Sequence, residues 1–204
     1  MLDRRFFLAA GAALVVAGPL FAQHADLEPG PEAATEAPVP RRYLMEDAWG
    51  NALTDEDFLG KFVLIYFGYT GCPDVCPTTL SVIADALAGL DEAQAARVAP
   101  LFVTVDPDHD TAKLLQEYTA VFDSRIIPLR GPKAYTDHMV AAFNARYERI
   151  VPDPAQPERY SIDHTASVAL VGPDGQLIKR YPHGTTGAEM AADLKVQIAA
   201  VPEQ

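Results

Sequence analysis

The apolar segment of residues 62–69 leads directly into a short loop that carries both cysteines of this chain, Cys72 and Cys76. Almost every residue of the segment is apolar, which is typical of a central strand covered on both faces. After the loop, apolar residues recur at helical spacing from Leu80 to Leu87. We therefore expect an α/β domain in which the two sulfurs lie where a buried strand passes into a helix.

The rest of the chain also alternates between strand and helix patterns. Periodicity and turn residues predict an N-terminal hairpin at 43–53, with Trp49 as a core or packing residue. They also predict strands at 98–105 and 126–129, helices at 111–122 and 135–147, a hairpin at 165–181 and a last helix at 187–200. Two strand–helix units followed by a hairpin and a helix resemble the thioredoxin-like order. The sequence thus predicts a thioredoxin-like three-layer α/β fold with a central mixed sheet and an N-terminal β-hairpin.

The first 42 residues differ in kind from the rest. Arg4-Arg5 precedes an apolar run that ends at Ala22; this is the pattern of an export signal, and the paired arginines resemble a twin-arginine signal. A retained membrane anchor is the alternative, although the run is shorter than the roughly 20 residues that span a bilayer. Residues 23–42 read as a Pro/Ala/Glu-rich linker and residues 43–204 as the folded domain. Whether residues 1–22 are a signal or an anchor, we expect the folded domain to lie on the periplasmic side of a bacterial inner membrane.

The composition is that of a soluble domain, and the net charge disfavours one class of partner, nucleic acid. The chain is 49% hydrophobic and carries a formal net charge of −12. The hydrophobic share is near that of ordinary soluble domains and supplies a core of normal size. The negative charge opposes binding to a phosphate backbone. We therefore expect no nucleic-acid partner.

The spacing of the two cysteines favours chemistry over a structural role. An exported pair usually forms a structural disulfide, but a bridge from Cys72 to Cys76 would hardly restrict the unfolded chain, because only three residues lie between them. A thioredoxin has two residues between its sulfurs, and the extra residue here points toward a metal. The start of the following helix favours a thiolate, above all at Cys76. Such a pair could bind a soft metal or act as a redox dithiol, and the two cysteines alone do not separate these roles.

A histidine decides between these two uses. His164 lies just before the strand that leads into the predicted second hairpin, in a loop that faces the cysteine loop of a thioredoxin-like sheet. Alone it would be interpreted as structural, but opposite a CxxxC pair we interpret it as a third ligand. Two thiolates and one imidazole suit copper, as Cu(I) or as Cu(II). Structural zinc would need a fourth protein ligand, for which the sequence offers no clear candidate. The other histidines are interpreted as linker, loop or surface residues: His24, His109, His138 and His183.

Three further segments accompany the CPDVCP loop: Gly68-Tyr69-Thr70 before it, Val105-Asp-Pro107 after the second strand, and the stretch from Tyr160 to His164. Together they resemble the Sco/SenC family of copper-binding assembly proteins for cytochrome c oxidase, over about residues 43–200. The resemblance implies copper held by Cys72, Cys76 and His164. It also implies a metallochaperone for the dinuclear copper site of oxidase subunit II, with a copper donor protein, a thiol reductant and commonly a membrane tether.

Other functions of the same residues stay open. A dedicated thiol:disulfide oxidoreductase, reducing the cysteines of the oxidase copper site, would need only Cys72 and Cys76. A copper or redox sensor could use the complete site. A peroxiredoxin is disfavoured, because the threonine and proline that precede the peroxidatic cysteine of that family are missing before both cysteines here. Apart from thiol–disulfide exchange, we expect no enzymatic activity.

Two acidic residues near the predicted site have competing interpretations. Asp163 is expected to hydrogen-bond its own loop, with an orienting role toward His164 as the alternative. Asp106 is expected to shape its loop together with Pro107 rather than to contact a metal.

Overall fold

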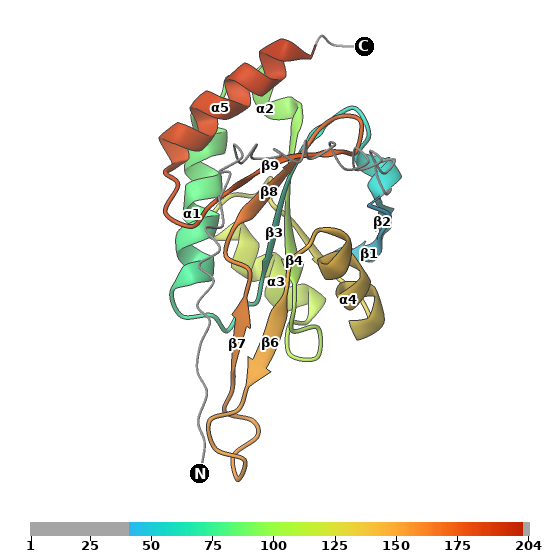
Figure 1. Cartoon of the computed structure of the whole chain (residues 1–204), viewed down its shortest axis with the longest axis vertical. Helices are drawn as coiled ribbons and strands as arrows, with labels where there is room; N and C mark the ends of the chain where they lie inside the picture. Colours follow the sequence, from blue (N-terminus) through green and yellow to red (C-terminus); the bar gives the residue numbers. More distant parts are fainter. Residues whose placement is uncertain (1–40, 202–204) are drawn as a thin grey trace, which may run out of the picture. The chain divides into compact units, whose positions relative to one another are not determined.

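A computed structural model of the chain describes residues 41–201 (Figure 1). The expected export signal or anchor at residues 1–22 lies outside the described residues, as does nearly all of the expected linker at 23–42. None of the helices in the described range is both long and apolar enough to cross a membrane.

Seven strands form one mixed sheet in the order β2-β1-β5-β4-β3-β8-β9. β3 and β4 pair in parallel from end to end, and β5 extends the parallel part, whereas the other neighbours are antiparallel. Every residue of β3 and β4 is buried, as expected for central strands covered on both faces. The strands are β1 (Leu44–Asp47), β2 (Ala52–Thr54), β3 (Phe62–Gly68), β4 (Val98–Thr104), β5 (Ile127–Arg130), β8 (Val168–Val171) and β9 (Leu177–Tyr181).

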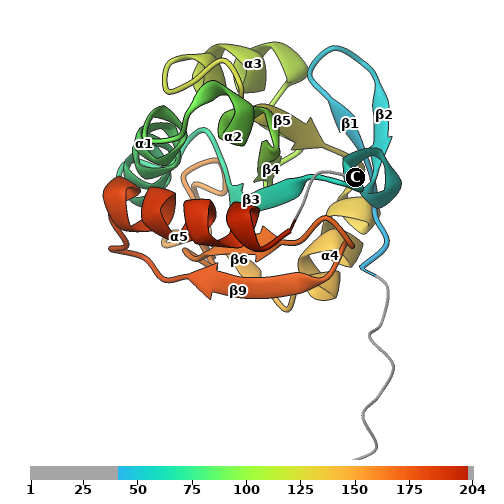
Figure 2. The same cartoon turned by 90° about the horizontal axis from the view of Figure 1, so that it is seen from above.

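Helices cover both faces of this sheet. α1 and α5 pack against each other on one face, and α4 lies on the other (Figure 2). Successive side chains of β3 point to opposite faces of the sheet. Tyr66 contacts Cys76 of α1 on one face, and Phe67 packs against Phe143, at the end of α4, on the other. The three layers and the mixed sheet confirm the expected α/β fold class. The helices are the 3-10 helix η1 (Asp55–Phe58), α1 (Val75–Ala88), α2 (Glu92–Ala96), α3 (Ala112–Ala120), α4 (Lys133–Ala142) and α5 (Gly187–Ala200).

A second, two-stranded sheet stands apart from the main one. Its antiparallel strands are β6 (Tyr147–Ile150) and β7 (Ser161–His164), and the hairpin projects away from the main sheet (Figure 1). At its base Tyr147 lies opposite His164, and the backbone N–H of Thr165 donates to the carbonyl of Arg146 over 3.0 Å. His164 therefore belongs to a separate hairpin, joined to β8 through residues 165–167.

Two expectations about individual positions are wrong. Trp49 is 56% exposed in the turn between β1 and β2, so it does not pack in the core. The carboxylate of Asp47 accepts the backbone N–H of Trp49, and this tight turn leaves the indole outside. The helix expected over 135–147 ends at Ala142, because Asn144 adopts a left-handed conformation with φ of 47°, which ends helices.

The chain contains more elements than expected. The strand expected from residue 165 begins at Val168, and residues 161–164 form β7 instead. Neither the β6–β7 hairpin nor the short helix α2 was predicted. The β6–β7 hairpin matters most, because it carries His164.

Candidate metal centre

The structure brings Cys72, Cys76 and His164 together. Cys72 lies in the loop after β3, Cys76 in the first turn of α1 and His164 at the end of β7. Each residue offers one donor atom, a sulfur from each cysteine and a ring nitrogen from the histidine. These three atoms lie within 4.8 Å of one another. Since Cys76 and His164 are 88 positions apart in the sequence, this proximity is produced by the fold and not by local sequence.

Cys76 occupies a pocket that glycine makes possible. Its side chain is fully buried, and its Sγ lies against the backbone of Gly68, the last residue of β3. A Cβ atom added to Gly68 would lie 2.8 Å from that sulfur and 2.8 Å from the ring of Phe102. A side chain at position 68 would thus displace the sulfur or the ring. Tyr66, also fully buried, donates its hydroxyl proton to the same sulfur over 3.5 Å.

The tautomer of His164 follows from its hydrogen bonds. Nδ1 lies 3.3 Å from the carbonyl oxygen of Thr165, which can only accept, so Nδ1 carries the proton. Nε2 therefore presents its lone pair toward Cys76, whose Sγ is 3.3 Å away and donates the thiol proton to it. A backbone carbonyl that orients an imidazole in this way is common around metal-binding histidines.

Two tyrosine rings hold the imidazole in place. The rings of Tyr66 and Tyr69 meet the ring of His164 edge to face, with centroid distances of 6.0 Å and 5.9 Å. The hydroxyl of Tyr69 also accepts the backbone N–H of Ile162, two residues before the histidine. The imidazole is thus fixed from the side of β3 as well as from its own hairpin.

Burial shifts the pKa of two of the donors, Cys76 and His164. It raises the pKa of the Cys76 thiol to about 12, against the hydrogen bonds that favour its thiolate. The expectation of a thiolate at Cys76 in the metal-free chain is therefore wrong, because desolvation outweighs the helix N-terminus. Burial also lowers the pKa of His164, which favours the neutral imidazole that a metal needs.

Cys72 differs from its partner in exposure. It is half-buried, and its sulfur accepts the backbone N–H of Cys76 over 3.4 Å. This is a bond from the N-terminal turn of α1, as the sequence position suggested. Cys72 is therefore the more exposed residue of the pair, and Cys76 is enclosed.

The acidic residues near the site have different surroundings. Asp163 is exposed, and within residues 41–201 its carboxylate takes no hydrogen bond, so the orienting partner of His164 is the carbonyl of Thr165. The expectation that Asp163 hydrogen-bonds its own loop is also wrong. Asp106 is buried, its backbone carbonyl accepts the N–H groups of His109 and Asp110, and it shapes its loop as expected.

Sequence reasoning missed the residues that surround the donors. Tyr66 and Gly68 belong to an apolar run, where they resemble ordinary core positions. The period-two alternation of a strand could have identified Tyr66, since it places positions 66 and 68 on one face, the face that α1 covers. Three of the other histidines, His109, His138 and His183, are exposed as expected, and His24 lies outside the described residues.

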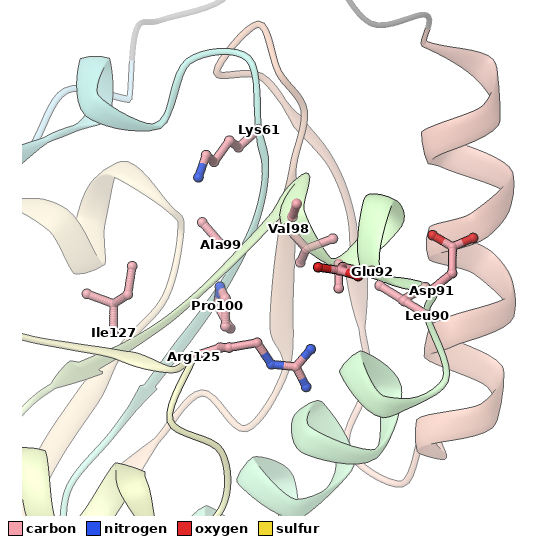
Figure 3. A pocket seen from close by; sticks show the side chains of 11 residues that line it. Lys61, Leu90, Asp91, Glu92, Val98, Ala99, Pro100, Arg125 and Ile127 are labelled. Atoms are coloured by element: carbon pink, nitrogen blue, oxygen red, sulfur yellow. The ribbon is translucent and has the colours of Figure 1, made fainter.

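Another hollow of the molecule has different chemistry. A groove of about 570 Å³ lies where β3 and β4 begin, whereas the cysteines follow the end of β3 (Figure 3). The groove is lined by apolar side chains and by four charged residues, Lys61, Arg125, Asp91 and Glu92. Neither a sulfur nor an imidazole is among its lining residues, so the three-donor cluster is the candidate metal centre. Its two soft sulfurs and one nitrogen fit copper.

Comparison with known proteins places this site in a family. The model of the SCO1/SenC family matches residues 31–199. The chain is 33% identical over 147 residues to the human protein "SCO1 homolog, mitochondrial", a match that covers 71% of this chain and 48% of that protein. The corresponding mouse protein is 35% identical over 147 residues, with 71% and 51% covered. The chain thus spans about half the length of these relatives.

Solved structures extend the agreement to the fold. Copper-bound ScoI of Bradyrhizobium japonicum superposes with a TM-score of 0.69 at 34% identity, over 76% of this chain and 97% of that one. Copper-bound yeast Sco1 gives a TM-score of 0.71 at 27% identity, over 79% and 88%. These likenesses confirm the thioredoxin-like architecture. The family model, the relatives and the arrangement of Cys72, Cys76 and His164 agree, and the chain belongs to the SCO1/SenC family.

Proposed function

We propose that this chain binds one copper ion through Cys72, Cys76 and His164 and delivers it to the dinuclear copper site of cytochrome c oxidase subunit II. The observation that carries the proposal is the meeting of the three donor atoms within 4.8 Å, from a loop, a helix and a separate hairpin. Proteins of known structure that resemble the chain, such as B. japonicum ScoI, have been described with copper bound.

The donor set suits a metal that must be held and then released. Two thiolates stabilise Cu(I), and an imidazole nitrogen adds affinity for Cu(II). Three protein ligands leave room for a ligand from a partner, so copper can pass by stepwise exchange of donors. Cys72 is the half-buried sulfur, and we infer that exchange begins there.

The cellular setting is part of the proposal. Residues 1–22 have the composition of an export signal or anchor, which favours action on the periplasmic side of a bacterial inner membrane. Cysteines in an oxidising compartment must be reduced before they bind copper. A thiol reductant and a copper donor protein are therefore further partners that we propose.

A second function is favoured by the asymmetry of the two sulfurs. In thiol–disulfide exchange the accessible thiolate attacks a target disulfide and the enclosed thiol then resolves the mixed disulfide. Cys72 and Cys76 have this arrangement, one half-buried and one buried. The pair would lose two electrons and two protons in forming its own disulfide, and the target disulfide would gain them as two thiols. Such a reductase would not need His164.

One experiment with two arms separates these functions. In one arm, the chain loaded with Cu(I) under anaerobic conditions is mixed with the metal-free copper domain of oxidase subunit II, whose cysteines are reduced. In the other arm, the reduced metal-free chain is mixed with the same domain, whose cysteines are joined as a disulfide. Copper delivery predicts transfer to the reduced target, with the His164→Ala variant defective in holding copper before transfer. A reductase predicts that the metal-free chain reduces the oxidised target and that His164→Ala acts normally. A wild-type chain that retains no copper would overturn the delivery proposal.

A further inference from the structure

The metal donors lie on two segments that different sheets support. Cys72 follows β3 of the main sheet, whereas His164 ends β7 of the separate hairpin. A site built this way needs contacts that fix the hairpin relative to the cysteine loop. The short loop of residues 105–111 after β4 contacts both segments, through Asp106 at one end and Asp110 at the other.

Asp106 holds the histidine hairpin. Its Oδ2 accepts the hydroxyl proton of Tyr160 over 2.5 Å, and Asp106 is only 7% exposed. Tyr160 directly precedes β7 and lies four residues before His164. The guanidinium of Arg149, from β6, stacks on the ring of Tyr160 at 3.6 Å. One tyrosine therefore joins both strands of the hairpin to the end of β4.

Asp110 holds the cysteine loop. It is fully buried, and its carboxylate accepts the hydroxyl of Thr70 over 2.5 Å, the backbone N–H of Thr70 over 3.1 Å and the hydroxyl of Thr104 over 2.5 Å. Thr70 lies two residues before Cys72. A buried carboxylate is tolerated where hydrogen bonds satisfy its oxygens. Here the partners come from the end of β4, from the cysteine loop and from His109, whose Nδ1 lies 3.2 Å from Oδ1 of Asp110.

The loop between the two carboxylates is itself a compact turn. The backbone N–H groups of His109 and Asp110 donate to the carbonyl of Asp106 over 3.1 Å and 2.9 Å. The backbone N–H of Asp106 in turn donates to the hydroxyl of Thr104 over 3.0 Å. The turn sets the separation between Asp106 and Asp110, and through them the separation between the two donor-bearing segments.

We propose that this turn is a clamp that sets the position of His164 relative to the cysteines, with Asp106 and Tyr160 as positioning residues for the histidine and Thr70 as the positioning residue for the cysteine loop. The inference deepens the proposed copper function and depends on it for its copper readout. Two other hydrogen bonds also hold the hairpin: the backbone N–H of Ile162 donates to the hydroxyl of Tyr69 over 3.2 Å, and the hydroxyl of Tyr147 donates to Asp137 of α4 over 2.5 Å. Loss of the Tyr160 bond should therefore loosen β7 without unfolding the hairpin.

The variant Tyr160→Phe tests the clamp, because it keeps the ring stacked on Arg149 and removes only the hydroxyl. In the metal-free chain, amide hydrogen exchange of residues 161–164 should become about fivefold to tenfold faster, while exchange in the cysteine loop stays unchanged. In the copper-loaded chain, release to a chelator should accelerate about tenfold, toward the rate of His164→Ala. Asp106→Asn, which keeps a neutral acceptor, should fall between Tyr160→Phe and the wild type.

Two further variants control for general effects. Tyr181→Phe removes a similar bond, from Tyr181 to Asp193 over 2.7 Å, between β9 and α5, and should change neither readout. Thr70→Val should affect the cysteine loop and not the hairpin, in contrast to Tyr160→Phe. We expect altered alkylation of Cys72 and normal amide hydrogen exchange at residues 161–164.

The outcomes separate the clamp from the copper proposal. Normal exchange and normal copper release in Tyr160→Phe would overturn the clamp, as would faster exchange spread over the whole domain. If the wild-type chain bound no copper, the copper proposal would fail, and the exchange measurement would still decide whether Tyr160 fixes β7.

Discussion

Sγ of Cys76 lies 3.3 Å from Nε2 of His164, with the thiol as donor and the imidazole as acceptor. This hydrogen bond occupies the space in which a metal would join the same two atoms. When the thiol loses its proton, the sulfur of Cys76 and Nε2 of His164 are no longer hydrogen-bonded to each other, and both can act as metal ligands. The metal-free chain is therefore organised for binding before the metal arrives, and the residues around this pair determine how tightly it binds.

The hydroxyl of Tyr66 should strengthen copper binding. Its bond to the Cys76 sulfur stabilises the thiolate, and a hydrogen bond of this kind contributes about 1 kcal/mol. Tyr66→Phe should weaken Cu(I) affinity about fivefold in a competition titration and shift the thiolate-to-Cu(II) absorption band. Tyr118→Phe is the matched control, because the hydroxyl of Tyr118 is buried and has no hydrogen-bond partner among residues 41–201. Equal affinity in wild type and Tyr66→Phe would show that the hydroxyl is irrelevant to the metal.

A methyl group at position 68 should damage the site. In Gly68→Ala the new Cβ would lie 2.8 Å from the Cys76 sulfur, closer than packed atoms allow. We expect a loss of about 1–3 kcal/mol in the free energy of unfolding, typical of overpacking, together with weaker copper binding. Gly71→Ala, where the nearest atom would be 3.4 Å away, is the control in the same loop. Denaturant unfolding that gave the same stability for both variants would refute the close packing of the sulfur.

The pH dependence of alkylation should reveal the protonated thiol. Because burial raises the pKa of Cys76 to about 12, the reactive thiolate is scarce at neutral pH and increases about tenfold per pH unit. In the metal-free Cys72→Ser variant, the alkylation rate should still be rising at pH 10. In the unfolded chain the alkylation rate should have its midpoint at about pH 8.5 and level off above it, as for ordinary thiols. Limited access lowers the whole curve without moving its midpoint, so a midpoint in the folded variant that matches that of the unfolded chain would contradict the raised pKa.

Much of the fold could be predicted because its central strands are apolar throughout. Residues 62–69 contain β3, and residues 98–105 contain β4. The β6–β7 hairpin escaped prediction because three of the four residues of β6 are exposed and follow neither strand nor helix periodicity. The turn at Asn144, which ends α4, depends on a left-handed conformation that an asparagine tolerates but does not require.

The proximity of the three candidate donors could be predicted, whereas the residues around them were missed. Cys72, Cys76 and His164 could be found because sulfur and imidazole are rare in this chain and the fold implies facing loops. The protonation of Cys76 was mispredicted, because a helix N-terminus contributes about 1 kcal/mol or less. The change in pKa from 9.0 to about 12 corresponds to about 4 kcal/mol. Burial therefore outweighs the helix N-terminus in setting the pKa of Cys76. How deeply Cys76 is buried is a property of the folded chain, which the sequence alone does not give.

The ligand set itself is the most direct test of the copper proposal. X-ray absorption at the copper edge, on the chain loaded with one equivalent of Cu(I) or Cu(II), counts sulfur and nitrogen neighbours. We predict two sulfurs and one imidazole nitrogen in the wild type, loss of the nitrogen in His164→Ala and loss of one sulfur in Cys72→Ser. The same neighbours in wild type and His164→Ala, or a copper ion shared by the sulfurs of two chains, would contradict a site made of Cys72, Cys76 and His164.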